Sequence, residues 1–355
     1  LENSTDAPIR DVHVRNGSRD TQFLELDLAG ARLVSNDQRF GYRIYRFDRP
    51  LEPGQTTSLT FKSRMWRRGF SASSPATDIV ENGTFVNNFD FAPVIGMDRQ
   101  GLLSDRTQRR RQGLAAELRP AKLEDMSATR HNYVGTDWVM SDISVTTDAG
   151  QVPIAPGSRV SDGIRDGRRT ARFVSGSPIL NFFSIQSADY EVASRDHYGV
   201  KRSVFYTQGH DWNVPKMLRA MAASLDYYRS NFGPYQFGYA RIIEFPRYAS
   251  FAQAFAGTMP YSESIGFVAD TSDPEKIDFT TYVIAHEIAH QYWAHQVIGA
   301  DMQGGTLTSE IERLRDGSQR IIVRSRVKPE FAGVDPYNFY VDRNSDDNVK
   351  EVTAS

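Results

Sequence analysis

The hydrophobic pattern of the chain changes period near residue 213. Different secondary structure is therefore predicted for the parts of the chain before and after this position. Before it, short stretches alternate apolar and polar side chains, as half-buried β-strands do. After it, apolar residues such as Met217, Met221, Leu225 and Tyr228 recur at intervals of three and four. That spacing predicts an amphipathic helix. The sequence therefore predicts an α+β protein whose first part is rich in strands.

Residues 1–208 are expected to form an N-terminal domain, an antiparallel β-saddle or β-sandwich. Its strands are predicted at residues 12–14, 23–28, 42–47, 59–62, 142–145 and 204–206. Residues 209–310 are predicted to form the domain that carries the chemistry, and residues 311–355 a short C-terminal β segment with a strand at 320–324. The chain begins at Leu1, within a strand-like stretch, so we expect a piece of a longer protein.

The second part should contain two helices separated by strands. Asn213 is expected to cap the first helix, with Pro215 in its first turn and an end at Gly233. Strands are predicted at 241–245 and 264–268. The second helix is expected to begin after Asp273 and to include residues 279–293.

Composition excludes several classes of function. The formal net charge of −2 gives no global support to a nucleic-acid partner. Cysteine is absent, which excludes disulfides, thiolate metal ligands and a cysteine nucleophile. No apolar stretch is long enough to span a membrane. The basic run at residues 106–111 is interpreted as a solvated loop, and contact with an anionic membrane surface is the alternative.

The second helix carries the motif with the most specific chemistry. His286 and His290 are four residues apart, so on a helix they project from one face and can share a metal ion. Neutral imidazoles are good Zn²⁺ ligands. Glu287 lies beside the pair, where it can reach a water molecule without binding the metal. The alternative is a structural histidine pair that is hydrogen-bonded to backbone. His295 is interpreted as a helix-end residue, and the other histidines as surface or core.

A catalytic zinc needs a third protein ligand and an open position. Glu310 is the candidate, with 19 residues between it and His290. That interval allows the helix to end, a turn at Gly304-Gly305 and the start of another helix.

The motif HEIAHQYW at residues 286–293 resembles the zinc helix of the aminopeptidase-N-like gluzincins. The segments LDYY at 225–228 and FGPY at 232–235 are similar to that family's approach to its catalytic domain. The resemblance covers residues 1–310 and implies a β saddle followed by a thermolysin-like domain. HQVIGA at 295–300 and DPYN at 335–338 resemble the bacterial branch fused to an ABC-type membrane permease. That branch implies a membrane-anchored protein whose soluble domain lies on the extracytoplasmic face.

The chain departs from the family at the motif that recognises a free N-terminus, Gly-x-Met-Glu-Asn. Residues 257–263 read GTMPYSE, so Gly257 and Met259 match while Pro260 replaces the glutamate. Glu263 is the nearest carboxylate, and we expect it to bind the α-ammonium group of a peptide. Gly257 and Met259 are expected to line the same substrate site. The alternative for Glu263 is a solvent-facing carboxylate.

The family also continues after its third ligand with a helical domain that supplies a transition-state-stabilising tyrosine. Here Glu310 is followed almost at once by a strand-like segment, so the helical domain is absent or the chain joins separated segments; we expect the latter. The catalytic tyrosine cannot be assigned, because Tyr337 and Tyr340 lie in the C-terminal segment.

The resemblance implies a zinc metallo-aminopeptidase with one Zn²⁺ per chain. Zn²⁺ held by His286, His290 and Glu310 would activate water, while Glu287 takes the proton and later delivers one to the leaving amine. Two alternatives stay open. One is another hydrolase on the same site, an endopeptidase or an epoxide hydrolase. The other is a non-catalytic scaffold.

Overall fold

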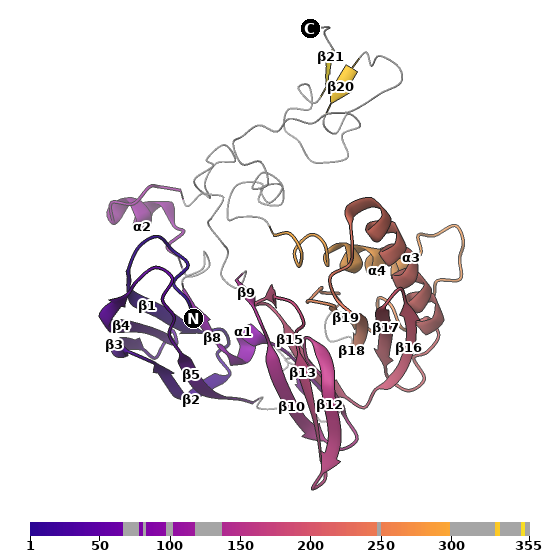
Figure 1. Ribbon diagram of the computed structural model, residues 1–355, viewed down its shortest axis with the longest axis horizontal. Coiled ribbons are helices and arrows are strands. Elements are labelled where there is room, and N and C mark those ends of the chain that lie inside the picture. Colours follow the sequence, from indigo (N-terminus) through magenta and orange to yellow (C-terminus); the bar gives the residue numbers. More distant parts are fainter. Residues whose placement is uncertain are drawn as a thin grey trace. The chain divides into compact units, whose positions relative to one another are not determined.

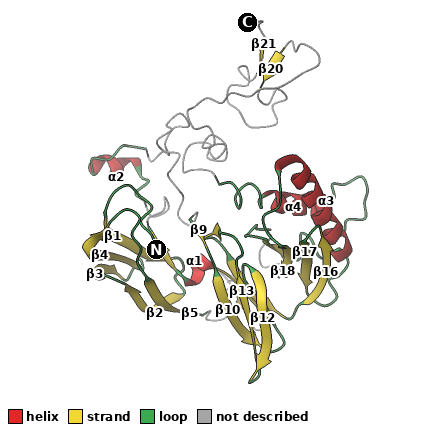
Figure 2. Ribbon diagram, in the orientation of Figure 1, coloured by secondary structure: helices red, strands yellow, loops and turns green. Residues whose placement is uncertain are grey.

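The computed structural model describes residues 1–66, 78–80, 83–96, 102–117, 137–246, 250–298, 331–333 and 349–351. Its chain divides into two compact units, Leu1–Ser309 and Glu310–Ser355. Strands dominate the described secondary structure, and the helices are few (Figure 2). In the second unit, the described residues form one antiparallel pair, β20 (Phe331–Gly333) with β21 (Val349–Glu351). The predicted strand at 320–324 lies outside the described residues. The predicted domain limits at 208 and 310 stay predictions.

The N-terminal strands form two antiparallel groups. A four-stranded sheet has the order β3-β4-β1-β8, and β2 pairs with β5. The bounds are Ile9–Asn16 (β1), Thr21–Leu28 (β2), Ala31–Asp37 (β3), Tyr42–Leu51 (β4), Leu59–Met65 (β5) and Pro93–Ile95 (β8). Their alternation buries Val14, Leu28, Tyr45 and Phe47 in one core. The four strands predicted between residues 12 and 62 are therefore confirmed.

The middle of the chain forms three further sheets, of which β9, β10, β12, β13 and β15 are labelled in Figure 1. Their orders are β11-β15-β7-β6, β10-β13-β12 and β14-β9. The bounds are Ile79–Val80 (β6), Gly83–Asn87 (β7), Trp138–Val139 (β9), Asp142–Asp148 (β10), Val152–Ile154 (β11), Ser158–Arg165 (β12), Arg168–Val174 (β13), Ile179–Leu180 (β14) and Ser184–Ala188 (β15). A single turn of helix, α1 (Asn88–Phe91), follows β7 and begins with a capping box formed by Asn87 and Asp90.

A further four-stranded sheet holds the residues of chemical interest. Its order is β16-β17-β18-β19, with bounds Glu191–His197, Val200–Tyr206, Tyr239–Phe245 and Thr258–Ser262. β16 and β17 are antiparallel, whereas β17, β18 and β19 run parallel. Parallel strands need a crossover connection, and α3 (Val214–Phe232) supplies it between β17 and β18. The carboxyl ends of these three strands therefore meet at one edge of the sheet.

Two helices cover one face of this sheet. The apolar stripe of α3 and the buried face of α4 (Phe279–Ala289) meet the strands in one core, which includes Met217, Met221, Ile242, Tyr261, Ile284 and Ile288. Each is at most 2% exposed. On the opposite face, Arg241 donates to the carbonyl oxygens of Ala155 (2.9 Å) and Gly157 (2.7 Å). These bonds join β18 to the segment between β11 and β12.

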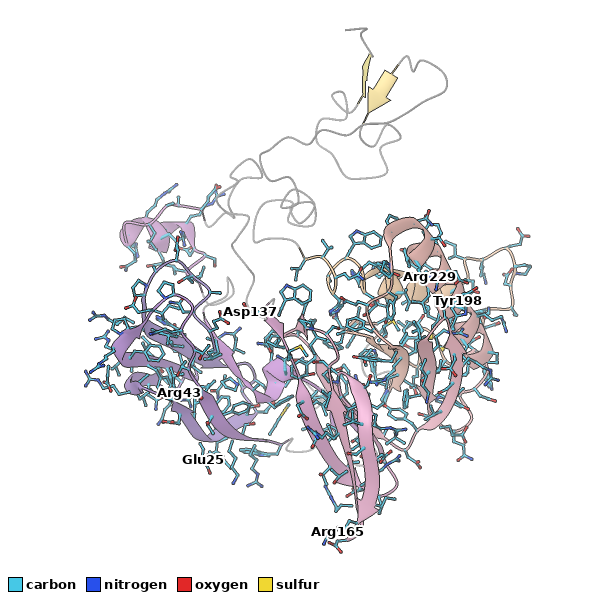
Figure 3. The ribbon with its side chains drawn as sticks, viewed as in Figure 1. Glu25, Arg43, Asp137, Arg165, Tyr198 and Arg229 are labelled. Atoms are coloured by element: carbon cyan, nitrogen blue, oxygen red, sulfur yellow. The ribbon has the colours of Figure 1, made fainter. Side chains whose placement is uncertain are left out.

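A surface contact fixes the outer end of α3. Arg229, near the end of the helix, places its guanidinium carbon 4.3 Å from the ring centroid of Tyr198, in the turn between β16 and β17 (Figure 3). This cation–π geometry contributes on the order of 0.5–1 kcal/mol at an exposed site.

Several sequence predictions are corrected here. Asn213 precedes α3 as expected, but its side chain bonds the carbonyls of Gly266, Phe267 and Ala269 instead of capping the helix. The strand predicted at 264–268 is a turn, and the edge strand is β19. The second helix is capped by Asp278, five residues later than expected, and it ends at Ala289. A local propensity cannot choose among several nearby Asp residues; packing does.

The basic run at 106–111 is also different from its prediction. It forms a short helix, α2 (Arg106–Arg111), and Arg109 is buried. Arg109 donates to the carbonyls of Ala115 (2.7 Å) and Leu103 (2.8 Å), so it closes its own loop. Among the described helices, none has the length and apolar character that crossing a bilayer requires.

Candidate metal centre

The helix α4 presents the histidine motif from the layer above the sheet. Asp278 starts the helix by accepting a hydrogen bond from the backbone N–H of Thr281 (3.2 Å). Ile284 and Ile288 face the core and are at most 2% exposed. The face that carries His286 is left open, because the helical repeat points it away from those isoleucines.

The two histidine side chains converge on one point. The Nε2 atoms of His286 and His290 lie 3.1 Å apart, and the ring planes are perpendicular. Bonds of about 2.0–2.1 Å in a tetrahedral site put two ligand atoms about 3.4 Å apart. The observed separation is close to that value. The residues present therefore fit a zinc ion.

The surrounding contacts prepare His290 as a ligand. Its Nδ1–H donates to the carbonyl oxygen of Trp293 (3.2 Å), which leaves the Nε2 lone pair free. Burial lowers the pKa of His286, and the neighbouring His290 lowers it further. A metal ligand must be the neutral imidazole, and both effects favour that form.

Glu287 occupies a different environment from the two histidines. Its side chain is 6% exposed, and burial raises the pKa of its carboxyl to about 7. One carboxyl oxygen, Oε2, is buried and has no hydrogen-bond partner among the described atoms. A buried polar atom without a hydrogen-bond partner destabilises the folded protein, so its presence calls for an explanation such as a catalytic role. A carboxyl group with a pKa near neutrality can both accept and return a proton.

The hairpin that leads into β19 is fastened to the end of α4. Gln291 accepts a hydrogen bond at Oε1 from the backbone N–H of Gly257 (2.7 Å) and donates from Nε2 to the carbonyl of Phe255 (3.1 Å). Gly257 has φ +62°, and a Cβ there would come within 2.4 Å of the Tyr239 ring. Met259 is 1% exposed and belongs to the core. Both residues thus have packing roles, and a substrate contact through the Met259 side chain is not available in this arrangement.

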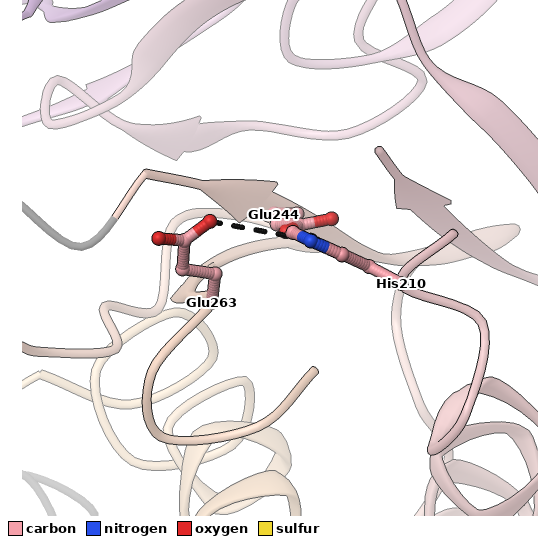
Figure 4. A group of neighbouring side chains, drawn as sticks. All are labelled: His210, Glu244 and Glu263. Atoms are coloured by element: carbon pink, nitrogen blue, oxygen red, sulfur yellow. Dashed lines mark hydrogen bonds and ion pairs between the residues drawn. The ribbon is translucent and has the colours of Figure 1, made fainter. Parts of the chain in front are cut away.

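Glu263 follows β19 and lies with two residues that the sequence did not single out. His210 comes from the loop after β17, and Glu244 stands near the end of β18 (Figure 4). His210 Nδ1 makes a short hydrogen bond to Glu244 Oε1 and lies 4.0 Å from Glu263 Oε2. Glu263 is 23% exposed, so it is not the fully solvent-facing carboxylate of the alternative interpretation.

The cluster and the helix α4 share one face of the sheet. Along β18, Ala240 and Ile242 pack into the core beneath the helices, so the alternation puts Glu244 on that face too. Glu244 pairs in register with Tyr261 on β19. Burial raises the pKa of Tyr261, and the charge of Glu287 raises it further.

Of the remaining residues considered for the site, His295 lies within the described part of the chain. Glu310, the expected third ligand, lies outside the described residues, as do Tyr337 and Tyr340. His295 is 1% exposed and donates from Nε2 to the carbonyl of Ala254 (3.1 Å). It therefore ties the same hairpin to the helix end, in agreement with its interpretation as a residue outside the ligand set.

Comparison with known proteins places the fold. No protein-family model and no curated protein matches the sequence. Among solved structures, the chain is similar to the M1 zinc metallopeptidase from Deinococcus radiodurans. The TM-score is 0.50 at 17% identity, and the match covers 87% of this chain and 65% of that one. A mutant of that peptidase, bound to a Tyr-Ser-Ala substrate, gives a TM-score of 0.48 with the same identity and coverage.

The similarity concerns the fold. This chain spans about 65% of the length of the metallopeptidase that it matches, so that protein's activity is not transferred by the comparison. Of the expected α+β fold, the strand-rich character is confirmed, because the described residues are mostly β-sheet with few helices and are similar in fold to that protein. The finer expectation of a thermolysin-like domain, and the fusion to a permease, receive no support from it.

Two site residues could have been found from the sequence. Glu244 lies within a strand that is buried throughout, β18, and a carboxylate in such a strand is unusual. His210 comes a few residues after the strand at 204–206. The sequence alone does not bring these residues together, because their proximity depends on β17, β18 and β19 being parallel neighbours in the sheet.

Proposed function

We propose that this chain is the catalytic region of a zinc-dependent peptidase of the M1 type, and that it releases N-terminal residues from peptides. The observation that carries the proposal is the convergence of His286 Nε2 and His290 Nε2, 3.1 Å apart, beside the buried carboxyl of Glu287. The fold similarity to an M1 zinc metallopeptidase supports it. So does the sequence resemblance of residues 286–293.

The metal would be held by His286 and His290, with Glu310 as the proposed third ligand. When bound, a zinc ion supplies Lewis-acid chemistry that polarises a scissile carbonyl and makes water more acidic. The chain contributes the proton transfer. Glu287, whose carboxyl pKa is raised to about 7 by burial, accepts a proton from the attacking water. It then delivers a proton to the departing amine.

Release of N-terminal residues needs a group that recognises the free α-ammonium. Glu263 is proposed for this role, because a charge-assisted hydrogen bond to a carboxylate favours the charged amine over a blocked one. Its backbone N–H donates to the carbonyl of Phe245 (3.0 Å), which fixes where the side chain begins. The side chain is 23% exposed, so the carboxylate is partly accessible from solvent.

The experiment that tests the proposal is a comparison of wild type with Glu287→Gln on aminoacyl reporter peptides. The variant should keep its zinc and lose about 10²–10⁴-fold in kcat, the contribution of a positioned general base. A variant that turns over at a near wild-type rate would show that Glu287 is not the base. Zinc content measured on the same samples separates loss of the base from loss of the metal.

An endopeptidase on the same site is the second candidate, favoured by the engagement of Glu263 with His210. Matched peptides with free and acetylated N-termini discriminate the two. The exopeptidase cleaves the free peptide and spares the acetylated one, whereas an endopeptidase cleaves both. A protein that binds no zinc and cleaves neither would be a scaffold. The proposed permease fusion and extracytoplasmic location remain predictions from the sequence resemblance.

A further inference from the structure

A second group of metal-ligating side chains lies at the carboxyl edge of the parallel strands β17, β18 and β19. It consists of His210, Glu244 and Glu263, and each comes from the end of a different strand or from the loop after it (Figure 4). Open sheets with parallel strands bind ligands at this edge, because several chain segments converge there. We propose that these three side chains bind a second divalent cation, Zn²⁺ by preference, at a site separate from the zinc helix.

The spacing of the ligand atoms suits such an ion. One nitrogen of His210 and one oxygen of each glutamate all lie within 4.8 Å of one another. A tetrahedral zinc site with bonds of about 2.0–2.2 Å puts its ligand atoms about 3.4 Å apart. His210 Nδ1 is closer than this to Glu244 and, at 4.0 Å, farther from Glu263 Oε2. A cation among them would replace the proton between His210 and Glu244, with side-chain shifts of about 1 Å.

The charges favour a cation. Glu244 is 2% exposed, and burial raises the pKa of its carboxyl; the hydrogen bond from His210 opposes that rise, while the charge of Glu263 adds to it. Two carboxylates this close repel each other. A divalent ion would stabilise both at once. An N,O,O ligand set is one that zinc accepts.

The outer contacts have the form expected around a metal site. The backbone N–H of Thr207 donates to Glu244 Oε2 (2.6 Å), so the buried carboxylate is held in orientation. The side chains of His210 and Glu263 are 29% and 23% exposed. One wall of the site is therefore buried and fixed, while two ligands remain reachable from solvent. That arrangement gives the ion an entry path and leaves room for water as a fourth ligand.

The site has a functional consequence that rests on the proposed function. Glu263 is the residue proposed to bind the substrate's α-ammonium, and it is also a ligand here. A cation bound at the cluster would compete with the substrate for this carboxylate. Excess Zn²⁺ should then raise the KM for peptides with a free N-terminus.

The test measures Zn²⁺ binding to the full chain by equilibrium dialysis and elemental analysis. The background is His286→Ala with His290→Ala, which removes the zinc-helix ligands. This double variant should still bind one Zn²⁺ per chain, and adding His210→Gln should weaken that binding by more than about 100-fold, since loss of even an outer partner costs 10–100-fold. Glu263→Gln is the second disrupting variant. Circular dichroism verifies folding of each.

A matched control is available in His197, which pairs with Asp226 at 2.8 Å and has a similar exposure, 21%. His197→Gln should leave zinc binding unchanged. The proposal is overturned if the folded double variant binds no Zn²⁺, which would leave only a hydrogen-bonded pair of His210 and Glu244, or if binding survives both His210→Gln and Glu263→Gln. Failure of the proposed function has a different signature: zinc content and peptidase activity that do not respond to loss of His286 and His290.

If the double variant does not fold, the same comparison is made in the wild-type background. His210→Gln should then lower the zinc content by one ion per chain and abolish the rise in KM caused by excess Zn²⁺. An unchanged zinc content in this variant overturns the proposal.

Discussion

The Nε2 atoms of His286 and His290 face each other across 3.1 Å at the last turn of α4. His290 directs its Nδ1–H to the carbonyl of Trp293, so its Nε2 accepts a hydrogen bond from the Nε2–H of His286. The proton shared by the two Nε2 atoms thus occupies the position in which a metal ion could bind both nitrogens. Helical spacing explains why the rings share a face, and the contact with Trp293 explains why they point at the same spot.

Removal of metal should lower the stability of this region. A ligand that binds only the folded state stabilises it by mass action, so chelation by EDTA should lower the Tm of the wild-type protein. His286→Ala should bind less zinc and respond less to EDTA. Calorimetry with and without chelator checks this. Equal shifts in wild type and variant would place the stabilising metal elsewhere.

The carboxyl of Glu287 should make the metal-free protein sensitive to pH. Its folded pKa of about 7 lies above the ordinary value of 4.5 for a glutamate, so its contribution to folding is complete below pH 4.5 and is lost as the pH rises through 7. Glu287→Gln stays neutral throughout. In EDTA, the variant should exceed wild type in free energy of unfolding by about 2 kcal/mol at pH 8 and by little at pH 5. Urea denaturation measures both; a constant difference contradicts the burial argument.

Gly257 should resist substitution more than a glycine with a similar backbone in open space. Its φ is +62°, and an added Cβ would lie 2.4 Å from the ring of Tyr239. Gly30 has φ +75° with nothing within 4 Å of the same atom. Gly30→Ala should cost about 1 kcal/mol from backbone strain alone, and Gly257→Ala about 2–4 kcal/mol, since overpacking is added. Thermal unfolding compares the two, and equal costs would mean that the ring moves freely.

Glu263→Gln should separate binding from catalysis. The amide keeps the shape of the side chain but loses its charge, so the KM for free-amine peptides should rise by about 10-fold or more while kcat changes less. The same substitution should have little effect on acetylated peptides. Steady-state kinetics on the matched pair decides. A fall in kcat with unchanged KM would assign Glu263 to the chemical step instead.

The sequence by itself determined the local features. Periodicity of two located β1, β2, β4 and β5, and spacing of three and four located α3, because these patterns depend on neighbours along the chain. The four-residue interval put His286 and His290 on one helix face for the same reason. Glu287 could be named from its place between them.

Tertiary structure decided what depends on contacts between distant segments. The residue that caps α4 is Asp278 and not the predicted Asp273. Asp278 accepts a hydrogen bond from the backbone N–H of Thr281, and Lys216 of α3 holds it in an ion pair (3.1 Å). Burial, which no local pattern fixes, set the raised pKa of Glu287. The parallel order of β17, β18 and β19 brought His210 to Glu244 and Glu263 across 34 and 53 positions of sequence. Such a meeting follows from strand order, and strand order depends on how the helices pack on the sheet.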